Sequence, residues 1–121
     1  MNTALWVAQI MLAFLFLAHG LMYLYPPDSV SKVLRKMPFS IGFFRFLGIA
    51  EVLAAPGLTL PGWTGLLPWL TPLAATGLAL IVGGAAVFHL REGEWLQAFV
   101  TAAVFALVAF VAVTRWFVIP L

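Results

Sequence analysis

Four apolar stretches, each long enough to cross a lipid bilayer, dominate this chain of 121 residues. A crossing helix needs roughly 20 apolar residues to span a hydrocarbon core about 30 Å thick. Stretches of this length lie at residues 3–25, 40–60, 70–90 and 95–117. The composition agrees, because 64% of the residues are hydrophobic and only 8% are charged, whereas a soluble domain carries about a quarter charged residues. We predict an all-α, polytopic membrane protein, folded as a single domain over residues 1–121.

Short connectors join the predicted spans, and the first connector contains a helix of its own. In "DSVSKVLRKMP" the apolar residues recur at helical spacing, and Lys32, Arg35 and Lys36 occupy the opposite side. We expect this short amphipathic helix to lie among the lipid head groups, between spans 1 and 2. Helices joined by short loops pack against their sequence neighbours in antiparallel order. The chain is therefore predicted to form a four-transmembrane-helix up-down bundle.

The basic residues predict the orientation of the bundle. Lys32, Arg35, Lys36 and Arg91 lie in the first and third connectors, and Arg115 lies near the opposite surface. Connectors rich in lysine and arginine face the cytoplasm. We expect both termini to be extracytoplasmic and the protein to reside in a bacterial cytoplasmic (inner) membrane.

The composition also limits the chemistry that the chain can perform. No cysteine is present, which excludes thiol chemistry and cysteine-ligated zinc or iron–sulfur clusters. The net charge of +2 is too small to indicate a nucleic-acid partner. We predict no metal site. Haem ligation by His19 and His89 would suit a four-helix bundle, but the two residues lie at different depths and no further ligand pattern accompanies them.

Glu51 is a carboxyl group predicted to lie near the middle of the membrane. It lies about 15 Å below the basic surface, and His19 lies about 9 Å below it, because a helix rises about 1.5 Å per residue. An ionisable side chain at such a depth costs about 2.5 to 3.5 kcal/mol on insertion scales and indicates a functional site. His19 is the nearest partner by depth. We predict that Glu51 and His19 transfer protons; the alternative is a neutral glutamic acid that only locks two helices together.

Four further residues near this surface are predicted to bind a substrate. Arg45 lies within about 6 Å of the basic surface, so its long side chain can reach head groups or the polar end of a ligand. His89 and Tyr23 lie at the same surface, and Gly48 shares a helix face with Glu51, where it allows close approach. For both histidines the alternative is an ordinary packing or interface role, because His19 lies among aromatic residues and His89 lies at a helix end before an arginine.

The stretches "FRFLGIAEVLAAPGL" and "LTPLAATGLALIVGGAAVFHLREGE" resemble the DoxX-like family of small four-helix membrane proteins. The arginine, glycine and glutamate of the second-span motif fall on Arg45, Gly48 and Glu51. The histidine at the end of the third span falls on His89, and "FLAHGLMYLY" fits the opening helix of the family.

The resemblance implies a membrane subunit in redox or acid–base chemistry. The family is named from a membrane subunit of a thiosulfate:quinone oxidoreductase, so the implied substrate is a lipophilic molecule such as a quinone, bound within the bundle. The sequence has no recognisable flavin or nicotinamide motif, so electrons would come from a bound cofactor or a soluble redox partner at the cytoplasmic face. Distant relatives act as assembly factors, so a non-catalytic membrane scaffold is the alternative.

Small residues recur along the third predicted span. Ala75, Ala79 and Gly83 lie four positions apart, a pattern that lets two helices pack backbone to backbone. Because so small a bundle has little interior of its own, we predict a homodimer. The alternative is that this stripe packs against the other helices of the same chain.

Overall fold

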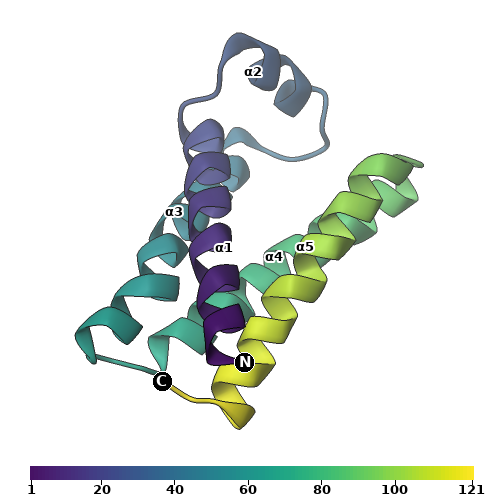
Figure 1. Ribbon diagram of the computed structural model, residues 1–121. Coiled ribbons are helices and arrows are strands. Elements are labelled where there is room, and N and C mark those ends of the chain that lie inside the picture. Colours follow the sequence, from purple (N-terminus) through teal and green to yellow (C-terminus); the bar gives the residue numbers. More distant parts are fainter.

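The computed structural model describes residues 1–121 and consists of helices joined by short connections (Figure 1). The elements are α1 (Asn2–Leu24), α2 (Asp28–Arg35), α3 (Ile41–Thr64), α4 (Leu70–Arg91), α5 (Trp95–Val113) and the π-helical turn η1 (Thr114–Val118). Four of the helices are long and apolar enough to cross a membrane. The predicted all-α fold with four spans is confirmed.

α3 continues past Leu60, where the sequence had indicated that the second span ends. Pro61 has no backbone N–H, so the carbonyl of Gly57 loses its helical donor. The hydroxyl of Thr71, in the first turn of α4, donates to this carbonyl at 2.7 Å. The helix then ends at Gly65, whose φ of 75° is left-handed. Proline is typical of turns, but α3 continues beyond Pro61 because Thr71 of the next helix donates the hydrogen bond that the proline cannot.

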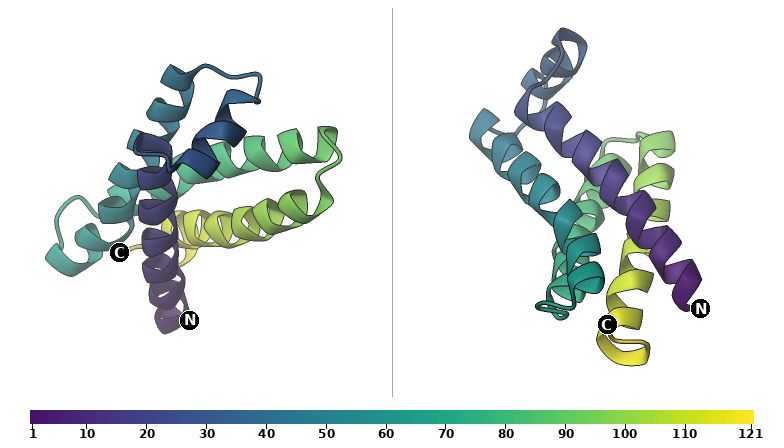
Figure 2. Two further views of the ribbon diagram at one scale, coloured as in Figure 1. Left: turned by 90° about the horizontal axis from the view of Figure 1, so that it is seen from above. Right: turned by 60° about the vertical axis from the view of Figure 1, so that its left-hand side comes forward.

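The four long helices form two antiparallel pairs. α1 packs along α3 and α4 packs along α5, whereas α3 meets α4, and α1 meets α5, over shorter stretches. The two pairs lie together at the end that holds both termini and diverge toward the end that holds α2 (Figures 1 and 2). The bundle is therefore a wedge, closed at the end with the termini and open at the end with α2.

Close-packed apolar side chains fill the closed end of the wedge. Leu5 and Leu12 of α1, Leu58 of α3, Leu78 of α4 and Val108 of α5 are at most 2% exposed and belong to one cluster. Lipid tails are as apolar as these side chains, so van der Waals packing holds the helices together here. This cluster joins the two helix pairs.

A buried polar network lies beside the apolar cluster. Arg115 Nε donates to Gln9 Oε1 at 2.8 Å, and Gln9 Nε2 donates to the carbonyl of Leu58 at 2.7 Å. The guanidinium also donates to the carbonyl of Ile119 at 3.0 Å and lies over the ring of Trp6. The network ties α1 to both α3 and η1, which adds directional bonds to the closed end.

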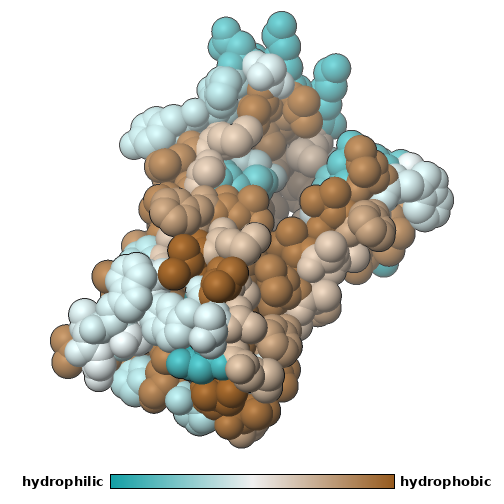
Figure 3. Space-filling model, viewed as in Figure 1, coloured by the Kyte–Doolittle hydropathy of each residue, from teal (hydrophilic) through white to brown (hydrophobic).

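The outer surface is apolar along the helices and hydrophilic over α2. Phe14, Leu80 and Phe99 are each more than 70% exposed, as expected for side chains that face lipid. Hydrophilic residues gather at the end formed by α2, above flanks that are mostly hydrophobic (Figure 3). The charged side chains of Lys32 and Arg35 are exposed on this helix.

The small residues of α4 are used inside the chain. Ala75 is fully buried in the core cluster. A Cβ added to Gly83 would lie 3.2 Å from the ring of Phe105 on α5. This stripe therefore packs α4 against its own neighbours, and the homodimer stays a prediction.

α1 and α3 cross with their backbones in contact at Gly20 and Gly48. A Cβ added to either glycine would lie 2.8 Å from the carbonyl oxygen of the other. Any side chain at this point would push the two helices apart. The crossing therefore requires glycine on both helices.

We expect Gly48→Ala to lower the free energy of unfolding by about 1 to 3 kcal/mol, because the added methyl group overpacks the crossing. Gly77→Ala is the matched control, since a Cβ there meets no atom within 4 Å. Thermal unfolding in one detergent compares the two variants. Equal melting temperatures for both variants would contradict the close crossing.

Candidate functional site

A cavity of about 510 Å³ occupies the open end of the wedge. Its walls come from α1, α3, α4, α5 and the segment that follows α2. Sites for small molecules typically have volumes of about 300 to 1,000 Å³. Of its 20 lining residues, 15 are hydrophobic, so a molecule that fits the cavity is largely apolar.

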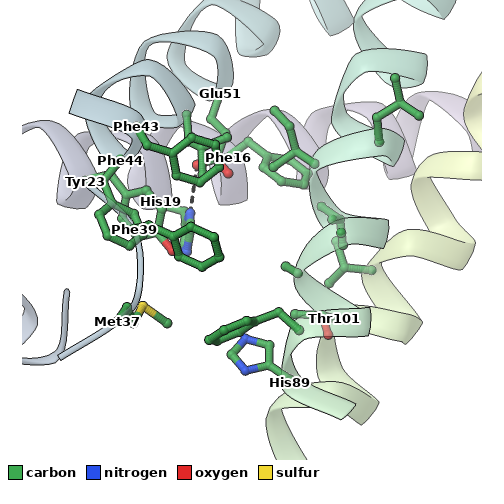
Figure 4. A pocket seen from close by; sticks show the side chains of 18 of the residues that line it. Phe16, His19, Tyr23, Met37, Phe39, Phe43, Phe44, Glu51, His89 and Thr101 are labelled. Carbon is green, nitrogen blue, oxygen red and sulfur yellow. Dashed lines mark hydrogen bonds and ion pairs between the residues drawn. The ribbon is translucent and has the colours of Figure 1, made fainter. Parts of the chain in front are cut away.

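Aromatic rings form much of the cavity lining. They belong to Phe16, Tyr23, Phe39, Phe43, Phe44 and Phe88. Phe39, which follows α2, has its ring centre 5.1 Å from that of Phe43 on α3 and 5.4 Å from that of Phe88 on α4. Its ring therefore connects the two diverging helix pairs (Figure 4). Flat rings on several sides favour a planar ligand.

His19 and Glu51 form a hydrogen-bonded pair on one wall of the cavity (Figure 4). Nδ1 of His19 lies 2.7 Å from Oε2 of Glu51. The carboxyl side chain is 3% exposed and the imidazole is 44% exposed, so the imidazole is the more accessible member. Nδ1 is occupied by Glu51, which leaves Nε2 for a ligand. This arrangement can carry a proton between the buried carboxyl and the cavity.

The glycine crossing brings this pair together. Gly20 follows His19 directly, and Gly48 precedes Glu51 by about one helical turn. The place of a Cβ on Gly20 is 3.1 Å from the Cβ of Glu51, so the glutamate packs on the backbone of α1. Tyr23, one turn beyond His19, has its ring centre 4.4 Å from that of the imidazole and limits its movement.

A second histidine–carboxylate pair lies on the α4 side of the cavity. Nδ1 of His89 is 2.9 Å from Oε1 of Glu94. The turn that ends α4 produces this contact: Glu94 N donates to the carbonyl of His89, Gly93 N donates to that of Leu90, and Gly93 has a left-handed φ of 71°. These bonds define a Schellman motif, which returns the chain over the last helical turn. Glu94 is thereby placed beside His89.

Comparison with known proteins assigns the chain to a family. The profile of the DoxX-like family matches residues 7–112, which include most of each span and both histidine–carboxylate pairs. The chain belongs to the DoxX-like family. No curated protein and no solved structure gives a significant match. Family and helices together make it an integral membrane protein.

The predicted site residues of this DoxX-like protein occupy three kinds of position. His19, Tyr23, Glu51 and His89 all line the cavity. Arg45 is exposed and does not line it, because six residues along a helix turn it about 120° away from Glu51. Gly48 is buried at the crossing with α1 and acts on the cavity only through the placement of its neighbours.

Two contributions to the site of the DoxX-like protein were not predicted. Phe39 and Met37 line one side of the cavity from the segment after α2; the sequence placed Met37 in the amphipathic helix and Phe39 in a connector, and indicated a site role for neither. Glu94 lies in the third connector, where the sequence had pointed only to Arg91, as a basic residue that orients the bundle. Gly93 could have indicated its position. A glycine just after the end of a helix often forms a Schellman turn, which brings the next residue, here Glu94, back over the last helical turn.

We expect Gly93→Ala to destabilise the protein by about 1 to 2 kcal/mol, because alanine at a left-handed φ is strained. Gly93→Asn is the matched control, since asparagine tolerates this conformation. Thermal unfolding measures the difference. An alanine variant as stable as the asparagine variant would show that the turn does not need the left-handed conformation.

Proposed function

We propose that this DoxX-like protein binds a lipophilic small molecule, most directly a quinone, in the cavity and exchanges protons with it through His19 and Glu51. The observation that carries the proposal is a buried carboxyl–imidazole pair on the wall of a largely apolar, aromatic cavity. A quinone has a flat ring that suits this lining. It also has carbonyl oxygens that accept a hydrogen bond from an imidazole N–H.

The roles of the two residues follow from their exposure. His19 lies at the cavity and donates from Nε2 to a ligand oxygen, while Glu51 holds the imidazole at Nδ1. When the ligand oxygen gains electron density on reduction, the imidazole passes it a proton, and the glutamic acid replaces that proton. The largely apolar lining of the cavity strengthens each of these bonds.

Electrons in this proposal come from a soluble redox partner or from another bound cofactor. The partner would approach the end of the bundle that holds α2, whose basic residues are exposed. We place this end in the cytoplasm and both termini outside it, because lysine and arginine concentrate on the cytoplasmic side of a membrane protein. The membrane would be the cytoplasmic membrane of a bacterium.

Gly84→Leu should abolish ligand binding by filling the cavity. Gly84 lines the cavity, and a Cβ there meets no atom within 4 Å, so the larger side chain enters open space. Gly77→Leu is the matched control, two turns away on the same helix, equally unobstructed and outside the cavity. Titration with a short-chain ubiquinone, followed by quenching of tryptophan fluorescence, measures the affinity. Equal affinity in both variants would place the ligand elsewhere.

Glu51→Gln should fold normally and lose the pH dependence of binding. The amide N–H can still donate to Nδ1 of His19, which keeps the proton on Nε2, so the melting temperature should change little. In the unchanged protein, affinity for the quinone should fall about tenfold as pH rises, because loss of the shared proton removes a hydrogen bond to the ligand worth about 1 to 3 kcal/mol. The same titration, repeated from acidic to mildly alkaline pH, measures this change.

Two results together would count against proton exchange at Glu51. They are pH-independent binding in the unchanged protein and identical binding in Glu51→Gln. Glu51 would then act as a structural lock between α1 and α3, and the non-catalytic scaffold would be the better account.

A further inference from the structure

The proposed function involves His19 and Glu51 but not the second histidine–carboxylate pair, His89 and Glu94. His89 lines the cavity between the helix pairs. Glu94, its partner at 2.9 Å, lines a separate groove of about 330 Å³. The groove lies between the segment around α2 and the turn that joins α4 to α5. Met37 and Phe88 line both the cavity and the groove, so the two spaces adjoin at these residues.

Glu94 is more exposed than His89, as a proton path that begins in water at Glu94 and leads inward through His89 requires. The side chain of His89 is 17% exposed and that of Glu94 is 41% exposed. The apolar residues Met37 and Phe88 occupy the wall beside the pair and cannot carry a proton. The pair is therefore a polar connection through an otherwise apolar wall.

We propose that His89 and Glu94 carry protons between the cavity and the aqueous groove. The inference rests on the proposed function, because it supplies the protons that His19 and Glu51 exchange with a ligand. A proton from the groove binds the carboxylate of Glu94 and passes from Oε1 to Nδ1 of His89. The imidazolium ring then turns about its Cβ–Cγ bond, releases the proton on Nδ1 to a ligand oxygen or a water in the cavity, and turns back. The ring keeps its Nε2 proton throughout, so one proton moves per cycle and no electron is transferred.

Other titratable groups lie on both sides of the pair, in the groove and in the cavity. Lys36 and Glu92 line the groove beside Glu94. On the cavity side, the titratable groups are His19, Tyr23 and Glu51 on the opposite wall. Glu92 offers a matched control, because it has the same charge and lines the same groove but makes no hydrogen bond or ion pair with His89.

Time-resolved infrared spectroscopy tests the pathway on the full chain with a short-chain ubiquinone bound. A light pulse releases protons from a caged acid, and the carboxyl band of Glu51, identified by its loss in Glu51→Gln, reports when they arrive. We expect Glu94→Gln and His89→Gln each to slow this arrival about 100-fold, the usual effect of losing a positioned proton carrier. Glu92→Gln should leave the rate unchanged. Quinone affinity should stay within about twofold of the unchanged protein in Glu94→Gln and Glu92→Gln, since neither residue lines the cavity.

The outcomes separate this inference from the proposed function. Arrival at the normal rate in both Glu94→Gln and His89→Gln, with quinone bound and Glu51 still titrating, would overturn the pathway and leave the proposed function intact. Slowing in Glu92→Gln as large as in Glu94→Gln would also overturn it, because surface charge alone would then set the rate. Failure of the unchanged protein to bind the quinone, or of Glu51 to titrate, would overturn both.

Discussion

The contact between Gly20 and Gly48 sets the geometry on which the candidate site depends. Backbone atoms of α1 and α3 meet there, at a distance that no other residue type allows. In a bilayer, helices gain little by hiding apolar surface from lipid, so such close contacts are what hold them together. The contact fixes the height and rotation of both helices. His19 and Glu51, which flank the two glycines, then meet at hydrogen-bonding distance.

The two ends of the wedge have different roles: the closed end supplies stability and the open end contains the cavity. At the closed end, packed leucines and the bonds between Gln9 and Arg115 hold the four spans together. Because stability is supplied there, the open end can leave a cavity between the helix pairs. Phe39 reaches across this opening and contacts rings on both sides. The polar side chains of the cavity thus lie on helices whose positions are fixed by the contacts at the closed end.

Sequence reasoning recovered the spans because their length and apolar composition follow directly from the thickness of the bilayer. It also anticipated the contact between His19 and Glu51, since depth along a helix can be counted from the membrane surface. It could not predict how far the helix pairs diverge, because this depends on side-chain packing across the whole bundle. The bond between Gln9 and Arg115 joins residues 106 positions apart, and the contact between His89 and Glu94 depends on the conformation of a single glycine.

Photochemical labelling tests most directly whether the cavity is a ligand site. A quinone carrying a photoreactive group would be bound to the protein in detergent, irradiated, and its attachment points mapped by mass spectrometry. The account predicts labels on the cavity-lining segments around Phe39 and Phe88, removed by an excess of unlabelled quinone. Labels spread over lipid-facing side chains such as Phe14 and Phe99, and unaffected by the competitor, would contradict it.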